Sequence, residues 1–444
     1  MKQSQVAMVQ HPATPDAQDI AAMLDRLLEH LGGIGQFVKP GDTVVIKGNF
    51  FAPYPPPVIV DRRVVGALVR QLVAAGASSV TLCEAVSIGT KLGRGTTTRR
   101  VLEDLGIRQA AEEAGARVVC LEDEERVTVE VPGARSLASI QYPKCMLDCD
   151  VLINLPCMKT HTMTLVTLGI KNFQGILDDG QKYYAHRDDL EQKLVDVQKV
   201  RRPDLTLIDG ITAMEGNGAG EGGTPRPMNL LIASGDVVAA DAVASACMGI
   251  GDVLDVATTR LAQHDGIGVA DLSRIQVLGA QIQEVRQPFV LPYTYTKPQD
   301  RYLTGVYPNV DVYIGGACRM CWMMATGMAQ ALSRYKEDRW ALFVGVDPKF
   351  AGTLDCPLDH VIFLGDCACS ATGDLKELRN QMLLTGEGLM APGCPPYRPA
   401  SAMLEEYLVS RGKLTGEMLE LGHRKAVRRT YEYYRTIDPT WDCK

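Results

Sequence analysis

The sequence contains no stretch of about 20 consecutive apolar residues, the length that a membrane-spanning helix requires. Its start lacks the basic segment and apolar core of a secretory signal peptide. The formal net charge is −7, so the basic excess typical of nucleic-acid-binding proteins is missing too. Nor does any internal repeat or low-complexity tract occur. These absences predict a cytoplasmic protein whose main partner is neither a membrane nor a nucleic acid.

The 444 residues are enough for two or three domains with a large core. Short apolar segments alternate with amphipathic helical patterns at a spacing of roughly 30 residues, which is typical of α/β proteins. The expected strands lie at 6–9, 42–48, 79–83, 117–121, 150–155, 205–209, 229–234 and 273–278. We therefore expect an α/β fold with a parallel or mixed sheet and flanking helices. Ligands of such sheets bind at the carboxyl ends of the strands.

The composition changes after this series of strands. Residues 287–310 are rich in Pro and Tyr and are expected to form a linker between an α/β domain, 1–286, and a smaller α/β domain, 311–400. The smaller domain contains expected strands near 312–314, 341–346 and 360–364. Residues 401–444 are expected to form a helical tail.

Cysteines gather in the smaller domain. In a cytoplasmic chain most cysteines are reduced thiols or metal ligands. The last third of this chain has a CxxC pair and later cysteines in loops bounded by Gly or Pro, which is typical of all-cysteine ligation of an iron–sulfur cluster. We predict a [4Fe–4S] cluster in a cluster-binding domain. The predicted ligands are Cys318, Cys321, Cys367 and Cys394, with Cys369 as the alternative ligand.

Three other interpretations of these cysteines remain open. Four of the thiolates could hold a structural Zn²⁺, although the long gaps fit zinc ribbons poorly. Cys318 and Cys321 could form a redox-active dithiol, or the cysteines could be unrelated. A cluster with four cysteine ligands would pass electrons or tune a nearby reaction. A cluster with one open iron could bind substrate as a Lewis acid.

A segment with several cations follows the expected strand 150–155. Lys159, His161, Lys171 and Asn172 place two cations, an imidazole and an amide near one strand end, and a helix is expected to begin near Thr162. The helix N-terminus would add N–H donors, so the segment predicts a site for phosphate or carboxylate. We expect Lys159 and His161 to be catalytic, and Lys171, Asn172 and Thr162 to bind substrate.

A glycine-rich loop begins at Glu215. Gly218, Gly220 and Gly223 satisfy the dinucleotide-binding pattern as a string, but no strand is expected directly before the loop and no helix after it. A loop over a substrate pocket is the favoured interpretation. Glu215 is then a candidate general base and Asn217 a candidate substrate contact.

Several spaced motifs resemble the family catalogued as domain of unknown function 362. The resemblance covers about residues 5–280 and rests on Lys159-Thr-His-Thr, Gly169-Ile-Lys-Asn, Asp209-Gly, Glu215-Gly-Asn-Gly, Gly95-Thr-Thr-Thr-Arg-Arg-Val-Leu, Gly106-Ile and Asp241-Ala-Val-Ala-Ser-Ala-Cys-Met-Gly. It implies an association with iron–sulfur centres but no specific reaction. Many relatives carry a ferredoxin-type run of cysteines. This chain has none, so the resemblance does not imply a two-cluster electron relay.

The sequence thus predicts an iron–sulfur enzyme, of the oxidoreductase or lyase type, that acts on a small anionic substrate bound between the two domains. An electron-transfer protein would be a further partner. The alternatives are a non-catalytic electron carrier or redox sensor, and a structural zinc protein. The sequence leaves open whether the chain forms a homo-oligomer.

Overall fold

The structure is a computed structural model that describes residues 3–88, 90–91, 95–220, 223–296, 305–350, 352–394 and 398–413. The chain divides into two compact units. Unit 1 comprises Met1–Thr90 and Thr96–Pro292, and unit 2 comprises Lys91–Gly95 and Tyr293–Lys444. Parts of the predicted linker, 297–304, and of the predicted helical tail, 414–444, lie outside the described residues.

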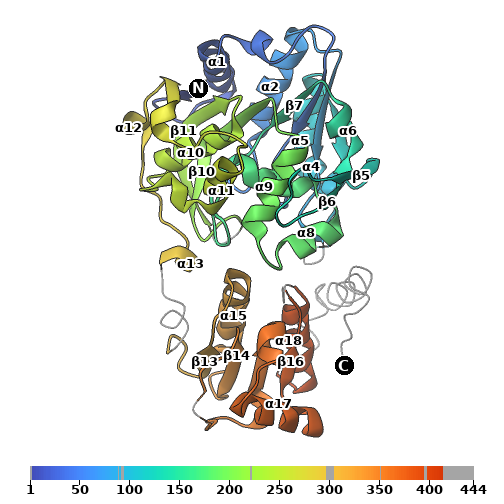
Figure 1. Ribbon diagram of the computed structural model, residues 1–444, viewed down its shortest axis with the longest axis vertical. Helices are drawn as coiled ribbons and strands as arrows, with labels where there is room; N and C mark the ends of the chain where they lie inside the picture. The colour runs from blue at the N-terminus through green and yellow to red at the C-terminus, as the bar shows by residue number, and fades with distance from the viewer. Residues whose placement is uncertain are drawn as a thin grey trace. The chain divides into compact units, whose positions relative to one another are not determined.

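Unit 1 is built on a mixed sheet of ten of the strands that the structure describes (Figure 1). The path of the sheet is β12 (Ile275–Gly279), β1 (Ser4–Gln10), β11 (Gly223–Ser234), β10 (Leu205–Gly216), β7 (Val151–Asn154), β2 (Thr43–Lys47), β3 (Ser79–Glu84) and β4 (Arg117–Cys120), with β8 (Cys157–His161) and β9 (Leu165–Thr167) beside β10. β10, β7, β2, β3 and β4 are parallel neighbours, whereas β11 runs antiparallel to β1 and β10. The predicted fold class is confirmed.

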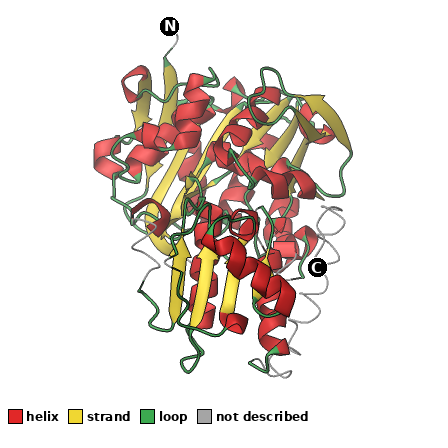
Figure 2. Ribbon diagram, turned by 60° about the horizontal axis from the view of Figure 1, so that its bottom comes forward, coloured by secondary structure: helices red, strands yellow, loops and turns green. Residues whose placement is uncertain are grey.

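Helices cover this sheet (Figure 2). The alternation of side chains along the strands explains their packing. The longer helices are α1 (Ala17–His30), α2 (Arg62–Ala74), α4 (Thr98–Asp104), α5 (Ile107–Glu113), α9 (Leu190–Val200), α10 (Val237–Cys247) and α11 (Ala257–His264). Ala7 and Val9 of β1 join the core cluster that contains the buried faces of α1 and α2. α10 consists mostly of small apolar residues, all of them buried, and packs on β1, β10 and β11.

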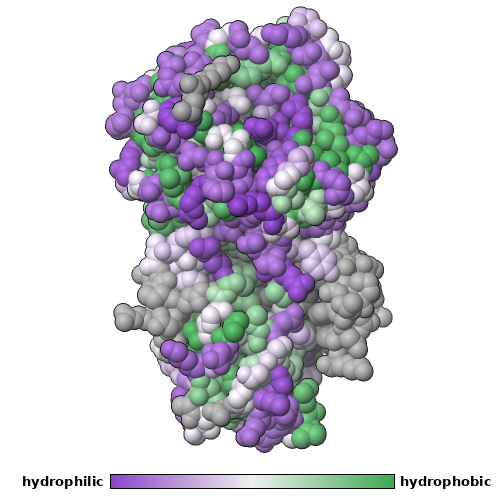
Figure 3. Space-filling view, in the orientation of Figure 1, coloured by the Kyte–Doolittle hydropathy of each residue, from purple (hydrophilic) through white to green (hydrophobic). Residues whose placement is uncertain are grey.

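Shorter elements complete unit 1. They are the helices α6 (Lys144–Asp148), α7 (Gly169–Asn172), α8 (Asp179–Ala185) and α12 (Ile282–Val285), the 3₁₀ helix η2 (Phe173–Ile176), and a separate hairpin of β5 (Arg126–Glu130) and β6 (Ser139–Pro143). None of the helices within the described ranges is both long enough and apolar enough to cross a membrane. The face of unit 1 in Figure 3 is mainly hydrophilic.

Unit 2 contains a smaller, fully parallel sheet. Its strands, in spatial order, are β13 (Val310–Ile314), β14 (Trp340–Val344), β15 (Val361–Leu364) and β16 (Leu389–Ala391). Its helices are α13 (Tyr293–Thr296), α15 (Arg319–Leu332), α16 (Gly365–Cys369), α17 (Asp374–Thr385) and α18 (Arg398–Ser410). Successive residues of β14 point to opposite faces of the sheet and enter two different core clusters. Leu342 packs with α15 and α18, and Phe343 packs with α17. The sheet therefore lies between two helical layers.

Two local predictions are wrong. No helix begins near Thr162, because β8 and β9 pair there as an antiparallel hairpin and Thr162 lies in its turn. The glycine-rich loop does follow a strand directly, because β10 continues to Gly216 and pairs with β11 over most of its length. The loop is thus the turn of a long hairpin. It is followed by a strand, which still disagrees with dinucleotide binding.

A buried ion pair joins the carboxyl ends of β2 and β3. Lys47 Nζ lies 2.8 Å from Glu84 Oε1, and each side chain is 1% exposed. Lys47 also donates to the Gly48 carbonyl at 2.7 Å, and Glu84 Oε2 accepts from the Phe50 N–H at 2.7 Å. A Cβ on Gly175 of η2 would lie 2.7 Å from both Glu84 Oε1 and Lys47 Nζ. Only glycine leaves room for the pair.

We expect Lys47→Met to destabilise unit 1 by about 3–5 kcal/mol, because it leaves the Glu84 carboxylate buried without its countercharge. The measurement is the free energy of unfolding in denaturant. Arg99→Met is the matched control, since Arg99 and Asp123 form a pair at 3.5 Å that is 60% and 63% exposed. That change should cost less than about 1 kcal/mol. Equal losses in the two variants would contradict the role given to the buried pair.

Candidate functional site

The four predicted cysteine ligands occupy equivalent places in unit 2. Cys318 is the N-cap of α15, which follows β13, and Cys321 lies in the first turn of that helix. Cys367 lies in α16, directly after β15, and Cys394 follows β16. Because the strands are parallel, their carboxyl ends meet at one edge of the sheet. The fold therefore brings cysteines from three distant parts of the sequence to the same edge.

The thiols at this edge influence one another's ionisation. A hydrogen bond from the Cys321 thiol, together with the N–H groups of Cys321 and Met320, lowers the pKa of Cys318 to about 6. The same hydrogen bond, burial and the negative charges of Cys318, Cys367 and Cys394 raise the pKa of Cys321. A thiolate at Cys318, next to a helix N-terminus, is the form that binds a metal. Within the described part of the chain, no three His, Cys, Asp or Glu side chains are arranged to hold a metal ion.

Cys369 lies in a different environment from these four. Its Sγ donates to the Phe363 carbonyl of β15 at 3.7 Å, and its side chain packs on the phenylalanine-rich core beside α17. Burial raises its pKa to about 12. Cys356 packs on the same core, and burial raises its pKa to about 11. Both are therefore protonated core thiols.

Lys159, a predicted catalytic residue, is enclosed in unit 1. Its Nζ donates to Asn49 Oδ1 and to the Val58 carbonyl, both at 2.8 Å, and lies 4.6 Å from the centre of the Phe51 ring. Burial lowers its pKa. Because Lys159 is completely buried and its amine is bonded to the protein, its role in this structure is to stabilise the fold.

Asn172, a predicted substrate contact, belongs to a buried chain of amides. Asn49 donates to Asn172 at 2.7 Å, Asn172 donates to Asn154 at 2.8 Å, and Asn154 donates to the Gly169 carbonyl at 2.9 Å. This chain links the ends of β2 and β7 to α7. Its effect is to fix the segment that carries Lys171.

Lys171 and His161 are partly exposed, unlike Lys159 and Asn172. Lys171 Nζ donates to Gln174 Oε1, and burial lowers the pKa of Lys171 to about 7. His161 Nδ1 accepts from the Met163 N–H at 3.0 Å, and burial lowers the pKa of His161 well below its ordinary value. A neutral His161 therefore carries its proton on Nε2.

The other predicted residues lie at the tip of the long β10–β11 hairpin or, for Thr162, in the β8–β9 turn bonded to it. Thr162 donates its backbone N–H to the Gly218 carbonyl at 3.0 Å, which seats the glycine turn on the β8–β9 hairpin. Glu215 Oε2 accepts from the Val290 N–H at 3.0 Å, and Glu215 Oε1 lies 3.6 Å from Arg226 Nη1. Asn217 is exposed in the turn. Glu215 thus holds the chain near Val290.

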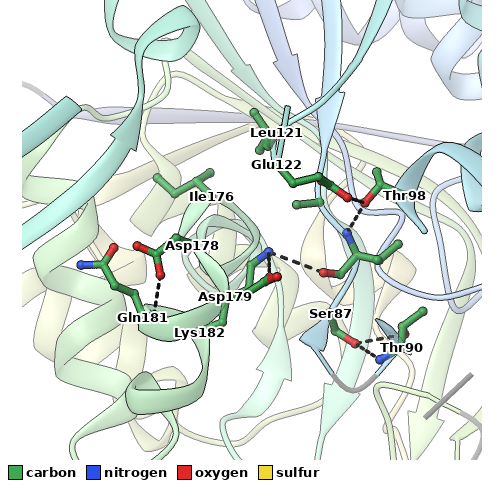
Figure 4. Close-up of polar contacts among 12 residues, drawn as sticks. Ser87, Thr90, Thr98, Leu121, Glu122, Ile176, Asp178, Asp179, Gln181 and Lys182 are labelled. Carbon is green, nitrogen blue, oxygen red and sulfur yellow. Dashed lines mark hydrogen bonds and ion pairs between the residues drawn. The ribbon is translucent and has the colours of Figure 1, made fainter. Parts of the chain in front are cut away.

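Sequence reasoning missed a further group of polar contacts in unit 1, which Figure 4 shows. Lys182 of α8 lies 3.5 Å from the Val86 carbonyl and 3.9 Å from Asp179. Thr98 links the Val86 N–H to Glu122 with hydrogen bonds of 3.0 and 2.5 Å. The sequence did offer a signal for the buried ion pair, because Lys47 and Glu84 are charged residues at the ends of two apolar strand segments.

Asp241 is a further buried group that sequence reasoning did not assign to the site. It lies in α10, and its two carboxylate oxygens accept from the N–H groups of Gly169 at 2.7 Å and Ile170 at 3.0 Å. Burial raises the pKa of Asp241 to about 7. Asp241 therefore holds the first turn of α7, two residues before Lys171.

The sequence pattern that defines the family described as Domain of unknown function (DUF362) matches residues 44–246. A thylakoid-associated protein of Synechocystis sp. is 34% identical over 235 residues, which are 51% of this chain and 70% of that protein. The chain belongs to the DUF362 family. The matched range contains Lys47, Glu84, Lys171 and Asp241, and it excludes the cysteine edge of unit 2.

Similarity to solved structures is weaker. The lactate racemase apoprotein from Thermoanaerobacterium thermosaccharolyticum aligns with a TM-score of 0.38 and 11% identity, over 77% of this chain and 82% of that one. A Thermotoga maritima protein aligns with a TM-score of 0.30 and 13% identity, over 58% of this chain and 60% of that one. Scores this low carry no conclusion about the activity of this chain.

We expect Asp241→Asn to change how stability depends on pH. The folded-state pKa of Asp241 is raised, so its carboxyl binds protons more tightly in the folded state, and its contribution to stability falls as pH rises from about 4 to about 7. The variant has no such group. Its stability relative to wild type should therefore increase by about 2–4 kcal/mol over that range. Denaturant unfolding at several pH values measures this, and a constant difference would contradict it.

Proposed function

We propose that the protein binds a [4Fe–4S] cluster in unit 2 through Cys318, Cys321, Cys367 and Cys394. The observation that carries the proposal is the convergence of these cysteines at the carboxyl edge of a parallel sheet. The other three raise the pKa of the Cys321 thiol. Cys369 stays outside the ligand set because its thiol faces the Phe363 carbonyl. Such a cluster supplies electron transfer or, with an open iron, Lewis acidity.

The proposal includes an enzymatic role, of the oxidoreductase or lyase type, on a small anionic substrate. Unit 1 supports this part, because Lys171 and His161 combine partial exposure with pKa values that burial has lowered. Lys171, whose pKa burial lowers to about 7, exchanges protons near neutral pH, whereas His161 stays neutral and would act as a hydrogen-bond donor from Nε2. Lys159 and Glu215 are held by protein partners, so Lys171 is the better candidate for proton transfer.

A second candidate function is electron transfer without catalysis. It is favoured by the exposure of Cys318 and Cys367, since a cluster near the surface exchanges electrons readily with another protein. We place either function in the cytoplasm, with an electron-transfer protein as partner and without nucleic acid. Because the Synechocystis relative is called thylakoid-associated, attachment to a membrane surface is the alternative location.

Metal analysis tests the ligand set. Protein purified without oxygen should contain about four irons and four sulfides per chain and give an EPR signal that dithionite changes. Changing any one of the four proposed ligands to Ser should lower the iron content or change the spectrum.

Cys369→Ser and Cys356→Ser are the matched controls, because both thiols lie in the same unit but pack on its core. These variants should keep the iron and the spectrum of wild type. Stoichiometric zinc without iron, or a loss of iron from Cys369→Ser equal to that from Cys367→Ser, would refute the proposed centre.

A further inference from the structure

Two hydrogen bonds join the segments that carry Cys367 and Cys394. Just beyond the last pair of the β15–β16 ladder, the Asp366 N–H donates to the Gly393 carbonyl at 3.2 Å. Asp366 Oδ1 in turn accepts from the Gly393 N–H at 2.6 Å. Asp366 directly precedes Cys367, and Gly393 directly precedes Cys394. One residue therefore connects the positions immediately before two of the proposed ligands.

A second connection of this kind lies between β13 and β14, before Cys318. Just beyond the last pair of their ladder, the Gly316 N–H donates to the Val346 carbonyl at 3.0 Å, and the Gly316 carbonyl accepts from the Val346 N–H at 3.4 Å. The approach requires glycine, because a Cβ on Gly315 would collide with the Val346 carbonyl oxygen. The backbone that leads into Cys318 is thus held against the end of β14.

The charge of Asp366 makes its position informative. A carboxylate beside a cysteine disfavours the thiolate, and thiolates are the form that binds iron. A neutral side chain before Cys367 would therefore suit a cluster better, unless the carboxylate has another task. The bond to the Gly393 N–H is such a task, because a carboxylate is a stronger acceptor than a neutral group.

We propose that Asp366 is a positioning residue, which sets the separation of Cys367 and Cys394 by joining Gly393 to the first turn of α16. The bridge between Gly316 and Val346 does the same for the segment before Cys318. Cluster binding then turns the cysteine side chains and leaves the backbone of these segments in place. This inference rests on the proposed function and deepens it, because it assigns the residues that hold the ligand set.

Asp366→Ala and Asp366→Asn separate the hydrogen bond from the charge. Alanine removes the acceptor, so that variant should lose its iron to the chelator EDTA at about a tenfold lower concentration than wild type does. Asparagine keeps an oxygen that can accept from the Gly393 N–H and should retain iron as wild type does. Because it removes a negative charge, its midpoint potential in an EPR-monitored redox titration should become less negative.

Asp355→Ala is the matched control for the charge. Asp355 is an acid of the same unit that is 76% exposed, and it pairs with Arg339 at 3.1 Å. Its loss should leave iron retention and the midpoint potential as in wild type, since exposed charges are strongly screened.

The second connection is tested with a pair of glycine variants. Gly315→Ala forces the backbone before Cys318 away from Val346 and should lower iron retention about tenfold. Gly327→Ala is the matched control, because a Cβ on this residue of α15 would have no heavy atom of the described residues within 4 Å. Its iron retention should equal that of wild type, and equal retention in the two variants would contradict the role of the bridge.

Crosslinking of the iron-free chain separates a failure of this inference from a failure of the proposed cluster. The short bifunctional thiol reagent dibromobimane should join Cys367 to Cys394 in wild type and in Asp366→Asn, and much less in Asp366→Ala. Mass spectrometry of the digested protein identifies the joined peptides.

Three results would overturn the role of Asp366. They are equal crosslinking in wild type and Asp366→Ala, wild-type iron retention in Asp366→Ala, and a loss of iron from Asp366→Asn as large as that from Asp366→Ala. A crosslink that depends on Asp366, in a protein that never takes up iron, would refute the proposed cluster and still support the positioning of the two cysteines.

Discussion

The buried pair of Lys47 and Glu84 is the interaction on which the architecture of unit 1 depends. Opposite charges that are each 1% exposed are stable only as a pair, so β2 and β3 must end at the same level. Gly175 closes over the pair, and that contact sets the path of the chain through η2. Gln174 and Lys171 lie on this path. One electrostatic requirement thus links the sheet to the basic residues above it.

In unit 2, too, side chains meet at the carboxyl ends of parallel strands, but here they are cysteines. Its cysteines come from segments far apart in the sequence, and the carboxyl ends of β13, β15 and β16 bring them together. The helix that begins at Cys318 adds N–H donors that favour a thiolate. The two units therefore gather different side chains at their strand ends: basic groups in unit 1 and cysteine thiols in unit 2.

Local signals predicted much of the fold, and long-range pairing decided the rest. The expected strands 79–83 and 117–121 appear as β3 and β4, because short apolar runs of this kind pair in a parallel sheet. The helix expected near Thr162 failed because β8 pairs with both β9 and β10, which a local pattern does not reveal. Likewise, the sequence predicted Lys159 to be catalytic, but only the folded chain shows that Asn49, Val58 and Phe51 enclose it. The contacts of Gln174 with Lys171 and His186 also appear only in the folded chain.

The contacts of Val290 have a mechanical consequence. Its N–H bonds to Glu215 and its carbonyl accepts from the Gly216 N–H at 2.6 Å, so the chain is clamped to the tip of the long hairpin just before unit 1 ends. These two backbone contacts fix the point at which the chain leaves unit 1, so the position of the hairpin tip sets the direction of the last residues before Pro292.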